Sequence, residues 1–353
     1  MSLCLYHPEY GYYMQGQDRT GVAGDYFTSP DLHSIFARLV ARHAVETWEI
    51  LGRPTPFTWV ELGPGRGWFA RDFLCWLKTA QPDLFATLDY VAVESGPQQR
   101  LRLKARLAED RLADKVRICA SLEELAPRTG CFFSNELVDS FPVSVVTRAG
   151  RELKEIYVAA DGESLREVPG PLSDSRLAAA VAHYGSELEE GNRMEVNSRA
   201  VRWIRSVAEK LARGFVVTVD YGDFAEYLYT PDRPRGTLMT YRAHVASEDF
   251  YYAPGEQDLT AHVNFSALID AGKEAGLELT GFTTQERFLM ALGEENEFAD
   301  LYDRGQTEPE KLQARLKLKR LILPEGMGTI FKVLIQHRGV PAPLLTGLKY
   351  QRQ

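Results

Sequence analysis

Cysteine is scarce in this 353-residue sequence, which contains only Cys4, Cys75, Cys119 and Cys131. No two of them form a Cys-x-x-Cys pair, and the seven histidines form neither a His-x-His nor a His-Glu-x-x-His motif. Such motifs supply the ligands of structural zinc sites, and densely paired cysteines supply disulfide scaffolds. We therefore expect neither a metal site nor a disulfide-based fold.

Long apolar runs are also missing. No run approaches the roughly 20 residues that span a bilayer, and the N-terminal residues contain no apolar core or cleavage site of a signal peptide. We expect neither a membrane protein nor an exported one. The lack of a presequence favours the bacterial cytoplasm, although a trimmed form from the mitochondrial matrix would look identical.

Positive charge is not in excess, because 41 Lys and Arg residues stand against 49 Asp and Glu residues, a formal net charge of -8. Proteins that bind nucleic acids neutralise phosphates with Lys and Arg, so this balance argues against a nucleic-acid partner. A small-molecule or basic partner fits better. The oligomeric state cannot be read from the sequence.

Short β-type runs alternate with helical segments over much of the chain. The β-type runs are residues 57–62, 90–94, 116–120, 131–135 and 215–220, and the helical segments between them are 68–79, 97–107 and 201–211. This alternation predicts βαβ units, a parallel sheet covered on both faces, and ligands at the carboxyl ends of the strands. The fold class is therefore α/β.

Other segments interrupt or flank this alternation. The aromatic residues 1–30 predict a loop-like arm, and the spacing from Pro30 to Trp48 predicts one helix with Ser29 as its N-cap. A hairpin near 143–158, a Pro/Gly stretch and a polar helix near 175–188 follow the fourth strand. We expect these parts: an arm or lid at 1–30, a core at 31–141 and 197–222, insertions at 142–196 and 223–262, the C-terminal part of the core at 263–338, and a tail at 339–353.

The most informative motif is a glycine-rich turn that directly follows the first β-type run. Gly63, Gly65 and Gly67 let the backbone turn tightly and approach a ligand, and Glu94 ends the next strand, where a carboxylate accepts hydrogen bonds from ribose hydroxyls. A dinucleotide fingerprint needs glycine at position 68, where this chain has Trp68. Glu61 adds a negative charge that repels a pyrophosphate and favours a cationic ligand. These features predict S-adenosyl-L-methionine, against the alternative of a turn that only packs a helix on a strand.

Several blocks of the sequence resemble the MidA-like S-adenosylmethionine-dependent methyltransferases, a family that includes a mitochondrial complex I assembly-factor methyltransferase. The matching blocks cover nearly the whole chain and are residues 6–13, 24–30, 61–67, 135–139, 220–222 and 255–263. The resemblance implies a Rossmann-like, seven-stranded fold with insertions after strands four and five. It also implies protein arginine as the methyl acceptor, on a subunit of respiratory complex I. The family usually has a helix before the first block, which is absent here, and Phe-Phe where this chain has Leu137 and Val138.

Two further serines are candidates for binding the cofactor. Ser121 follows the third strand, where this cofactor class commonly has its adenine contact, and Ser29 ends a segment that could fold over the cofactor. Each serine also has a simpler interpretation as a helix N-cap, Ser121 for a helix that begins near Leu122.

Asn135, Glu136 and Asp139 follow the fourth strand and are the candidate catalytic residues. If Glu136 begins a helical turn, Asp139 lies on the same face, and the two carboxylates could hold a guanidinium. We expect Glu136 to orient the acceptor and Asp139 to assist. His262 is the best candidate for a proton relay, although a hydrogen-bonded core histidine is the more common case. Polar residues near it, including Asp258, could line an acceptor channel.

Two other functions fit the same sequence. One is a small-molecule O- or N-methyltransferase, which a compact pocket sealed by Tyr227, Tyr229 and Tyr241 would favour. The other is an assembly chaperone that binds the cofactor without catalysis.

Overall fold

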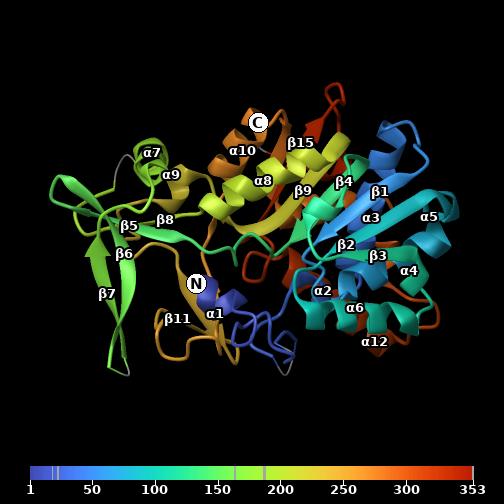
Figure 1. Ribbon diagram of the computed structural model, residues 1–353. Helices are drawn as coiled ribbons and strands as arrows, with labels where there is room; N and C mark the ends of the chain where they lie inside the picture. Colours follow the sequence, from blue (N-terminus) through green and yellow to red (C-terminus); the bar gives the residue numbers. More distant parts are fainter. Residues whose placement is uncertain (18, 22–23, 163, 186–187, 352–353) are drawn as a thin grey trace. The chain divides into compact units, whose positions relative to one another are not determined.

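The computed structural model in Figure 1 describes residues 1–353 except 18, 22–23, 163, 186–187 and 352–353. The last two residues of the predicted tail therefore lie outside the described residues. The chain divides into two compact units. Unit 1 contains Met1–Tyr26, Val138–Ile204 and Tyr221–Ala271, and unit 2 contains Phe27–Leu137, Arg205–Asp220 and Gly272–Gln353.

Unit 2 is built around a mostly parallel β-sheet with the strand order β14-β15-β9-β4-β1-β2-β3. These strands are β1 (Phe57–Leu62), β2 (Leu88–Val93), β3 (Val116–Cys119), β4 (Arg128–Asn135), β9 (Leu211–Asp223), β14 (Glu278–Thr284) and β15 (Phe331–Arg338). β1 pairs in parallel with β2 and β4, β2 with β3 and β4 with β9, whereas β14 and β15 are antiparallel. The last residues of β9 lie in unit 1, where β13 (Val263–Asn264) pairs with them. The predicted Rossmann-like α/β fold is confirmed.

Aromatic side chains fill the core on one side of this sheet. All six residues of β1 are buried, as expected of a central parallel strand whose two faces are covered by helices. Trp59 on β1 packs against Phe73 on α4 (Trp68–Ala80), with ring centroids 4.7 Å apart, and Phe69 stacks on Phe133 of β4 at 4.5 Å. These contacts fix α4, and with it the glycine turn that precedes α4, against the sheet.

The other helices of this part of the chain are α5 (Pro82–Thr87), α6 (Pro97–Glu109), α11 (Gln285–Glu294) and α12 (Glu308–Ile322), and α8 (Ser198–Lys210) and α10 (Phe265–Glu274) each cross the boundary between the units. The expected helices at 68–79, 97–107 and 201–211 correspond to α4, α6 and α8.

The single helix expected from Pro30 onward is wrong. The structure has two helices, α2 (Ser29–Leu32) and α3 (Ile35–Ile50), because His33 is extended at φ -164° and its Nδ1 accepts a hydrogen bond from the backbone N–H of Ile35 at 3.0 Å. The N-cap is Thr28 rather than Ser29, since Thr28 forms a capping box with Asp31. Ser29 is therefore the first residue of α2.

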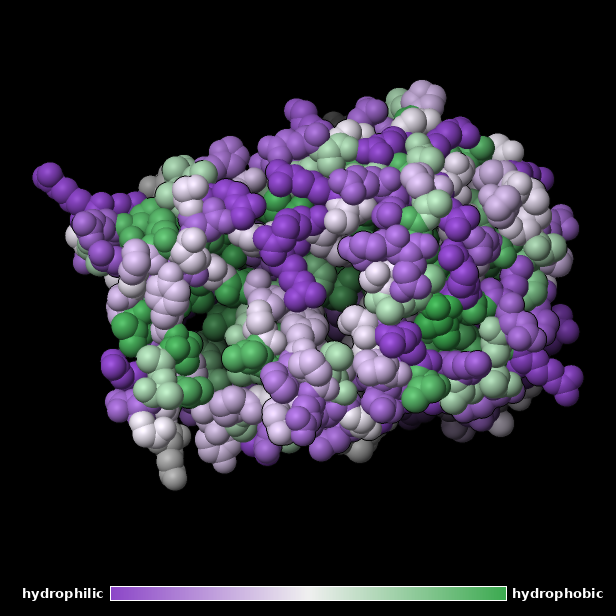
Figure 2. All heavy atoms as spheres, in the orientation of Figure 1, coloured by the Kyte–Doolittle hydropathy of each residue, from purple (hydrophilic) through white to green (hydrophobic). Residues whose placement is uncertain are grey.

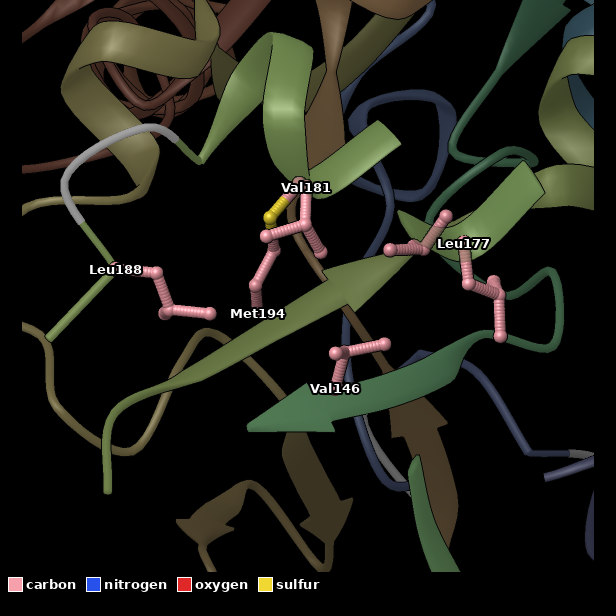
Figure 3. Close-up of a cluster of buried hydrophobic side chains, with 6 residues drawn as sticks. Val146, Leu177, Val181, Leu188 and Met194 are labelled. Atoms are coloured by element: carbon pink, nitrogen blue, oxygen red, sulfur yellow. The ribbon is translucent and has the colours of Figure 1, made fainter. Parts of the chain in front are cut away.

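Unit 1 contains an antiparallel sheet with the order β7-β6-β5-β8, formed by β5 (Ser144–Ala149), β6 (Glu152–Asp161), β7 (Ser164–Gly170) and β8 (Arg193–Val196). The expected hairpin is β5–β6. β7 extends it where the sequence indicated only a Pro/Gly stretch. α7 (Ser175–Tyr184) packs on this sheet. Figure 3 shows Leu177 and Val181 of α7 beside Val146 of β5 and Met194 of β8, in a cluster of buried apolar side chains.

A second group of elements in unit 1 contains the N-terminal segment. It comprises α1 (Ser2–Tyr6) and a small sheet in which β10 (Met239–Arg242) pairs with β11 (Val245–Ser247) and β12 (Asp258–Thr260). The short helix α9 (Ala225–Leu228) also lies in unit 1. Leu5, Tyr12 and Leu259 form the buried core of this group. The expected loop-like arm therefore contains a short helix, because Leu5 is anchored by apolar contacts too distant in sequence to be visible in the local pattern.

The surface is predominantly hydrophilic on the face shown in Figure 2, where apolar residues appear in separate patches. Within the described residues, no helix combines the length and the apolar character needed to cross a bilayer.

Replacing Leu177 by alanine tests the packing of α7. Leu177 is 2% exposed, so Leu177→Ala should lower the free energy of unfolding by about 2–5 kcal/mol. Leu312→Ala, in α12, is the matched control because Leu312 is 50% exposed, and it should change stability by less than about 1 kcal/mol. Urea denaturation followed by circular dichroism measures both. Equal losses in the two variants would contradict the packing described for α7.

Candidate functional site

The carboxyl ends of β1, β2, β4 and β9 bring the predicted residues of unit 2 to one edge of the sheet. Leu62 on β1 lies opposite Val93 on β2 and opposite Ser134 on β4. The residues that follow them, which are Gly63, Glu94 and Asn135, therefore leave the sheet side by side. Asn135 in turn pairs with Val219, which places Asp220 at the same edge. This is where ligands bind in open α/β sheets.

Glycine is required at the three positions of the turn for different structural reasons. All have positive φ, at 72° for Gly63, 52° for Gly65 and 80° for Gly67. A Cβ on Gly63 would lie 2.8 Å from Leu137 Cδ1, and one on Gly67 would collide with Leu103 Cδ1. A Cβ on Gly65 would meet nothing within 4 Å. Packing therefore explains Gly63 and Gly67, whereas Gly65 borders open space, as expected of a backbone that a ligand approaches.

Glu94 joins the glycine turn to the end of β2. Its Oε2 accepts a hydrogen bond from the Gly65 N–H at 3.3 Å, and its Oε1 accepts one from the Gly96 N–H at 2.7 Å. Burial raises the pKa of this carboxyl, and the two backbone N–H groups act in the opposite direction. Each carboxylate oxygen has a second lone pair. These two acceptor oxygens thus fit a ligand with neighbouring hydroxyls, such as a ribose.

Glu61 lies inside β1, 4% exposed, and its Oε2 accepts a hydrogen bond from the Tyr90 hydroxyl at 2.7 Å. Burial raises its pKa to about 8; the Tyr90 hydrogen bond lowers it, and the nearby Glu94 raises it further. Glu61 is therefore mostly protonated at pH 7, contrary to the negative charge expected from the sequence. A cation beside Glu61 would lower this pKa and restore the charge.

Glu136 follows β4 with a φ of 51°, in the left-handed region, so it does not begin the helical turn that the sequence suggested. Its Oε1 accepts hydrogen bonds from the backbone N–H of Ser29 at 2.9 Å and from Asn135 Nδ2 at 2.8 Å. The Oδ1 of Asn135 is buried, and no atom of the described residues donates a hydrogen bond to it. Left-handed backbone at a residue other than glycine is uncommon and concentrates at functional sites.

The two serines differ in what their surroundings explain. The Ser29 hydroxyl is buried and lies 3.2 Å from Gln285 Oε1, while its backbone N–H orients Glu136. Ser121 is the N-cap of a short 3₁₀ helix (Leu122–Glu124) in a capping box with Glu124, so its simpler interpretation as a cap is confirmed. The contacts of both serines with a cofactor stay predictions.

Asp139 lies in unit 1, where it is 6% exposed; burial raises its pKa, and the nearby Tyr221 phenol acts in the opposite direction. His262 is half-buried; its ring stands edge-on to Tyr221 with centroids 5.3 Å apart, and its backbone N–H donates to Thr237 Oγ1 at 3.1 Å. His262 is thus held beside Tyr221. Its role as a proton relay stays a prediction.

Asp258 is 3% exposed and accepts a hydrogen bond from the Tyr13 hydroxyl at 2.6 Å, a contact that the sequence pattern does not predict. Asp258 was expected only as one lining residue of a channel, and the aromatic arm was not connected to it. The available signal was the position of Asp258 within the block 255–263 that carries the family resemblance. Of the three tyrosines considered for a closed pocket, Tyr227 is 59% exposed, which does not suit a seal.

Comparisons with known proteins agree on the family. The model of a family described as "Putative S-adenosyl-L-methionine-dependent methyltransferase" matches residues 39–283. The chain is 27% identical to the Drosophila melanogaster homolog of the mitochondrial protein arginine methyltransferase NDUFAF7, over 96% of this chain and 80% of the relative. It is 28% identical to the human protein of that name, over 100% of this chain and 81% of the relative.

Solved structures give the same result. A Burkholderia thailandensis protein crystallised with S-adenosyl-homocysteine is 32% identical, with a TM-score of 0.89 over 100% of this chain and 89% of that chain. A native crystal structure of a protein from the same organism and superfamily has 31% identity and a TM-score of 0.86, with the same coverage. Because the family model spans well over half of the sequence, the chain belongs to this family of S-adenosyl-L-methionine-dependent methyltransferases, and the MidA-like resemblance is confirmed.

Proposed function

We propose that this methyltransferase modifies an arginine side chain of a protein. The observation that carries the proposal is the carboxylate of Glu136, which two donors hold at the carboxyl end of β4. A carboxylate fixed in this way suits a planar guanidinium, which donates paired hydrogen bonds. The curated relatives named protein arginine methyltransferase support the same acceptor. A complex I subunit as the substrate and the bacterial cytoplasm as the compartment stay predictions from the sequence.

The glycine turn and Glu94 are the proposed cofactor site. Gly65 lets the backbone approach the ligand, and Glu94 accepts hydrogen bonds from the ribose hydroxyls. Glu61, beneath the turn, becomes ionised next to a positive charge. When bound, S-adenosyl-L-methionine supplies a methyl group on a sulfonium. Ser121 and Ser29 complete the proposed set.

Glu136 and Asp139 have separate roles in this proposal. The acceptor nitrogen forms one bond to the methyl carbon and loses one proton, while the bond from that carbon to sulfur breaks. Glu136 orients the guanidinium, Asn135 holds Glu136, and Asp139 accepts the proton. Burial raises the pKa of Asp139 to about 6, which makes it a better base than an exposed aspartate. His262, whose ring lies beside Tyr221, is the proposed relay that receives the proton afterwards.

Incubation with a lysate and S-adenosyl-L-methionine labelled in its methyl group tests the acceptor. Wild-type protein should label protein bands whose acid hydrolysates contain methylarginine. Glu136→Gln should lower this labelling at least about 100-fold and change the dissociation constant of S-adenosyl-homocysteine less than threefold, because the amide keeps the shape but loses the charge that orients the guanidinium. The exposed Glu325→Gln is the control and should behave as wild type. Label in another residue, or full activity in Glu136→Gln, would contradict the proposal.

Replacing Gly65 by alanine tests the cofactor site. Gly52 is a matched control, since it has a φ of 83° and, like Gly65, open space where a Cβ would lie. Both alanines should cost about 1–2 kcal/mol of stability because of the left-handed backbone. Only Gly65→Ala should weaken binding of S-adenosyl-homocysteine, by about tenfold or more, in a calorimetric titration. Equal affinities in the two variants would mean that the ligand does not approach Gly65.

A further inference from the structure

Asp258 is a buried carboxylate whose charge is not balanced by a cation of the described residues. It is 3% exposed, and no Lys, Arg or His of the described residues lies within 4.0 Å of it. Arg19 and Arg199, two cations of the same unit, have other contacts. Arg19 lies 3.8 Å from Asp25, and Arg199 lies over the ring of Tyr6 at 4.9 Å. A buried carboxylate without a cation is costly unless it is protonated or receives a ligand.

One of the two oxygens of the Asp258 carboxylate is hydrogen-bonded within the protein. Its Oδ1 accepts hydrogen bonds from the Tyr13 hydroxyl at 2.6 Å and from the backbone N–H of Leu259 at 2.9 Å. Its Oδ2 accepts none from the described residues. Tyr13 thus fixes the orientation of the carboxylate and leaves one oxygen for another donor.

Thr260 is a second buried polar residue whose hydroxyl can still form hydrogen bonds. This observation does not depend on the charge of Asp258. It is 2% exposed, and its Oγ1 has no hydrogen-bond partner among the described residues. Thr260 lies two residues after Asp258 on β12, so both side chains are on one face of the strand, opposite Leu259. Buried hydroxyls nearly always have partners, so this one has hydrogen-bonding capacity left for a ligand.

The groups around Asp258 are carboxylates and phenols from several elements. Asp139, which follows β4, and Asp25, in the N-terminal segment, act on Asp258 electrostatically. The phenols whose pKa is raised in part by Asp258 are those of Tyr6, Tyr12, Tyr13, Tyr26 and Tyr241. A guanidinium stacks on aromatic rings and donates to carboxylates, so a group of phenols and carboxylates suits it.

We propose that Asp258 is the anionic contact of a guanidinium subsite within unit 1 that binds the arginine-containing substrate, and that Tyr13 is the positioning residue that aims its carboxylate. Thr260 supplies a further hydrogen-bond acceptor at the same face. The inference rests on the proposed arginine methyltransferase activity and adds a recognition residue to it.

Ethylguanidinium and its neutral analogue ethylurea test this subsite, with binding measured by ligand-observed NMR in the presence of S-adenosyl-homocysteine. Burial, together with the neighbouring Asp139 and Asp25, raises the pKa of Asp258 to about 7, against the lowering effect of the Tyr13 hydrogen bond. A cation binds the ionised form, so ethylguanidinium should bind about tenfold more tightly at pH 8 than at pH 6. Ethylurea should not bind. Equal binding of the two probes, or no binding of ethylguanidinium to the wild type, would overturn the proposal.

Substitutions at Asp258 and Tyr13 locate the effect. Asp258→Asn should abolish ethylguanidinium binding, and Asp258→Glu should restore part of it. Tyr13→Phe keeps the carboxylate but removes a hydrogen bond that lowers its pKa, so the midpoint of the pH dependence should move upward. Tyr157→Phe is the control because Tyr157 also bonds a carboxylate, that of Glu155, yet is 38% exposed. An unchanged midpoint in Tyr13→Phe would overturn the role of Tyr13, even if Asp258→Asn failed to fold.

Methyl-transfer assays on the same variants separate this proposal from the proposed function. Unchanged methylarginine formation by Asp258→Asn would reject the subsite and leave the arginine methyltransferase activity intact. Loss of ethylguanidinium binding in Asp258→Asn, with no methylarginine formed even by the wild type, would support the cation subsite and reject the proposed function.

Discussion

The parallel pairing of β1 with β2 and β4 is the constraint on which the candidate site depends. Its register ends the three strands at the same level, so the glycine turn, Glu94 and Asn135 leave the sheet as neighbours. A shift of one strand by one residue would turn each of its side chains to the opposite face. The aromatic contacts of Trp59 and Phe69 hold α4 on this sheet and thereby fix the turn.

Buried carboxyl groups with a raised pKa are the second feature on which the candidate site depends. Burial raises the pKa of Glu61, Asp139 and Asp258, to about 8, 6 and 7 respectively. A cation that approaches any of the three would lower its pKa and favour the ionised form. The sulfonium of S-adenosyl-L-methionine and, in the proposed function, the guanidinium of the acceptor are such cations.

Much of the fold and of the candidate site could be predicted from the sequence, because β1 and the glycine turn are encoded locally. The alternation of strands and helices indicated the α/β fold, and the position of Glu94 after β2 followed from strand ends alone. The protonation state of Glu61 could not be predicted, because it depends on burial and on Tyr90, which is 29 residues away in the sequence. The break at His33 was hidden by an apolar spacing that continues through it. The link between Tyr13 and Asp258 spans 245 residues, and no local pattern reports such a contact.

The central claim is that the turn at Gly63–Gly67 and Glu94 together hold the adenosyl group. A crystal structure of this protein with S-adenosyl-homocysteine tests it most directly. The account predicts the ribose hydroxyls within hydrogen-bond distance of the Glu94 carboxylate and the ligand in contact with the backbone of Gly65. A ligand bound elsewhere, or one that leaves Glu94 bonded only to Gly65 and Gly96, would contradict it.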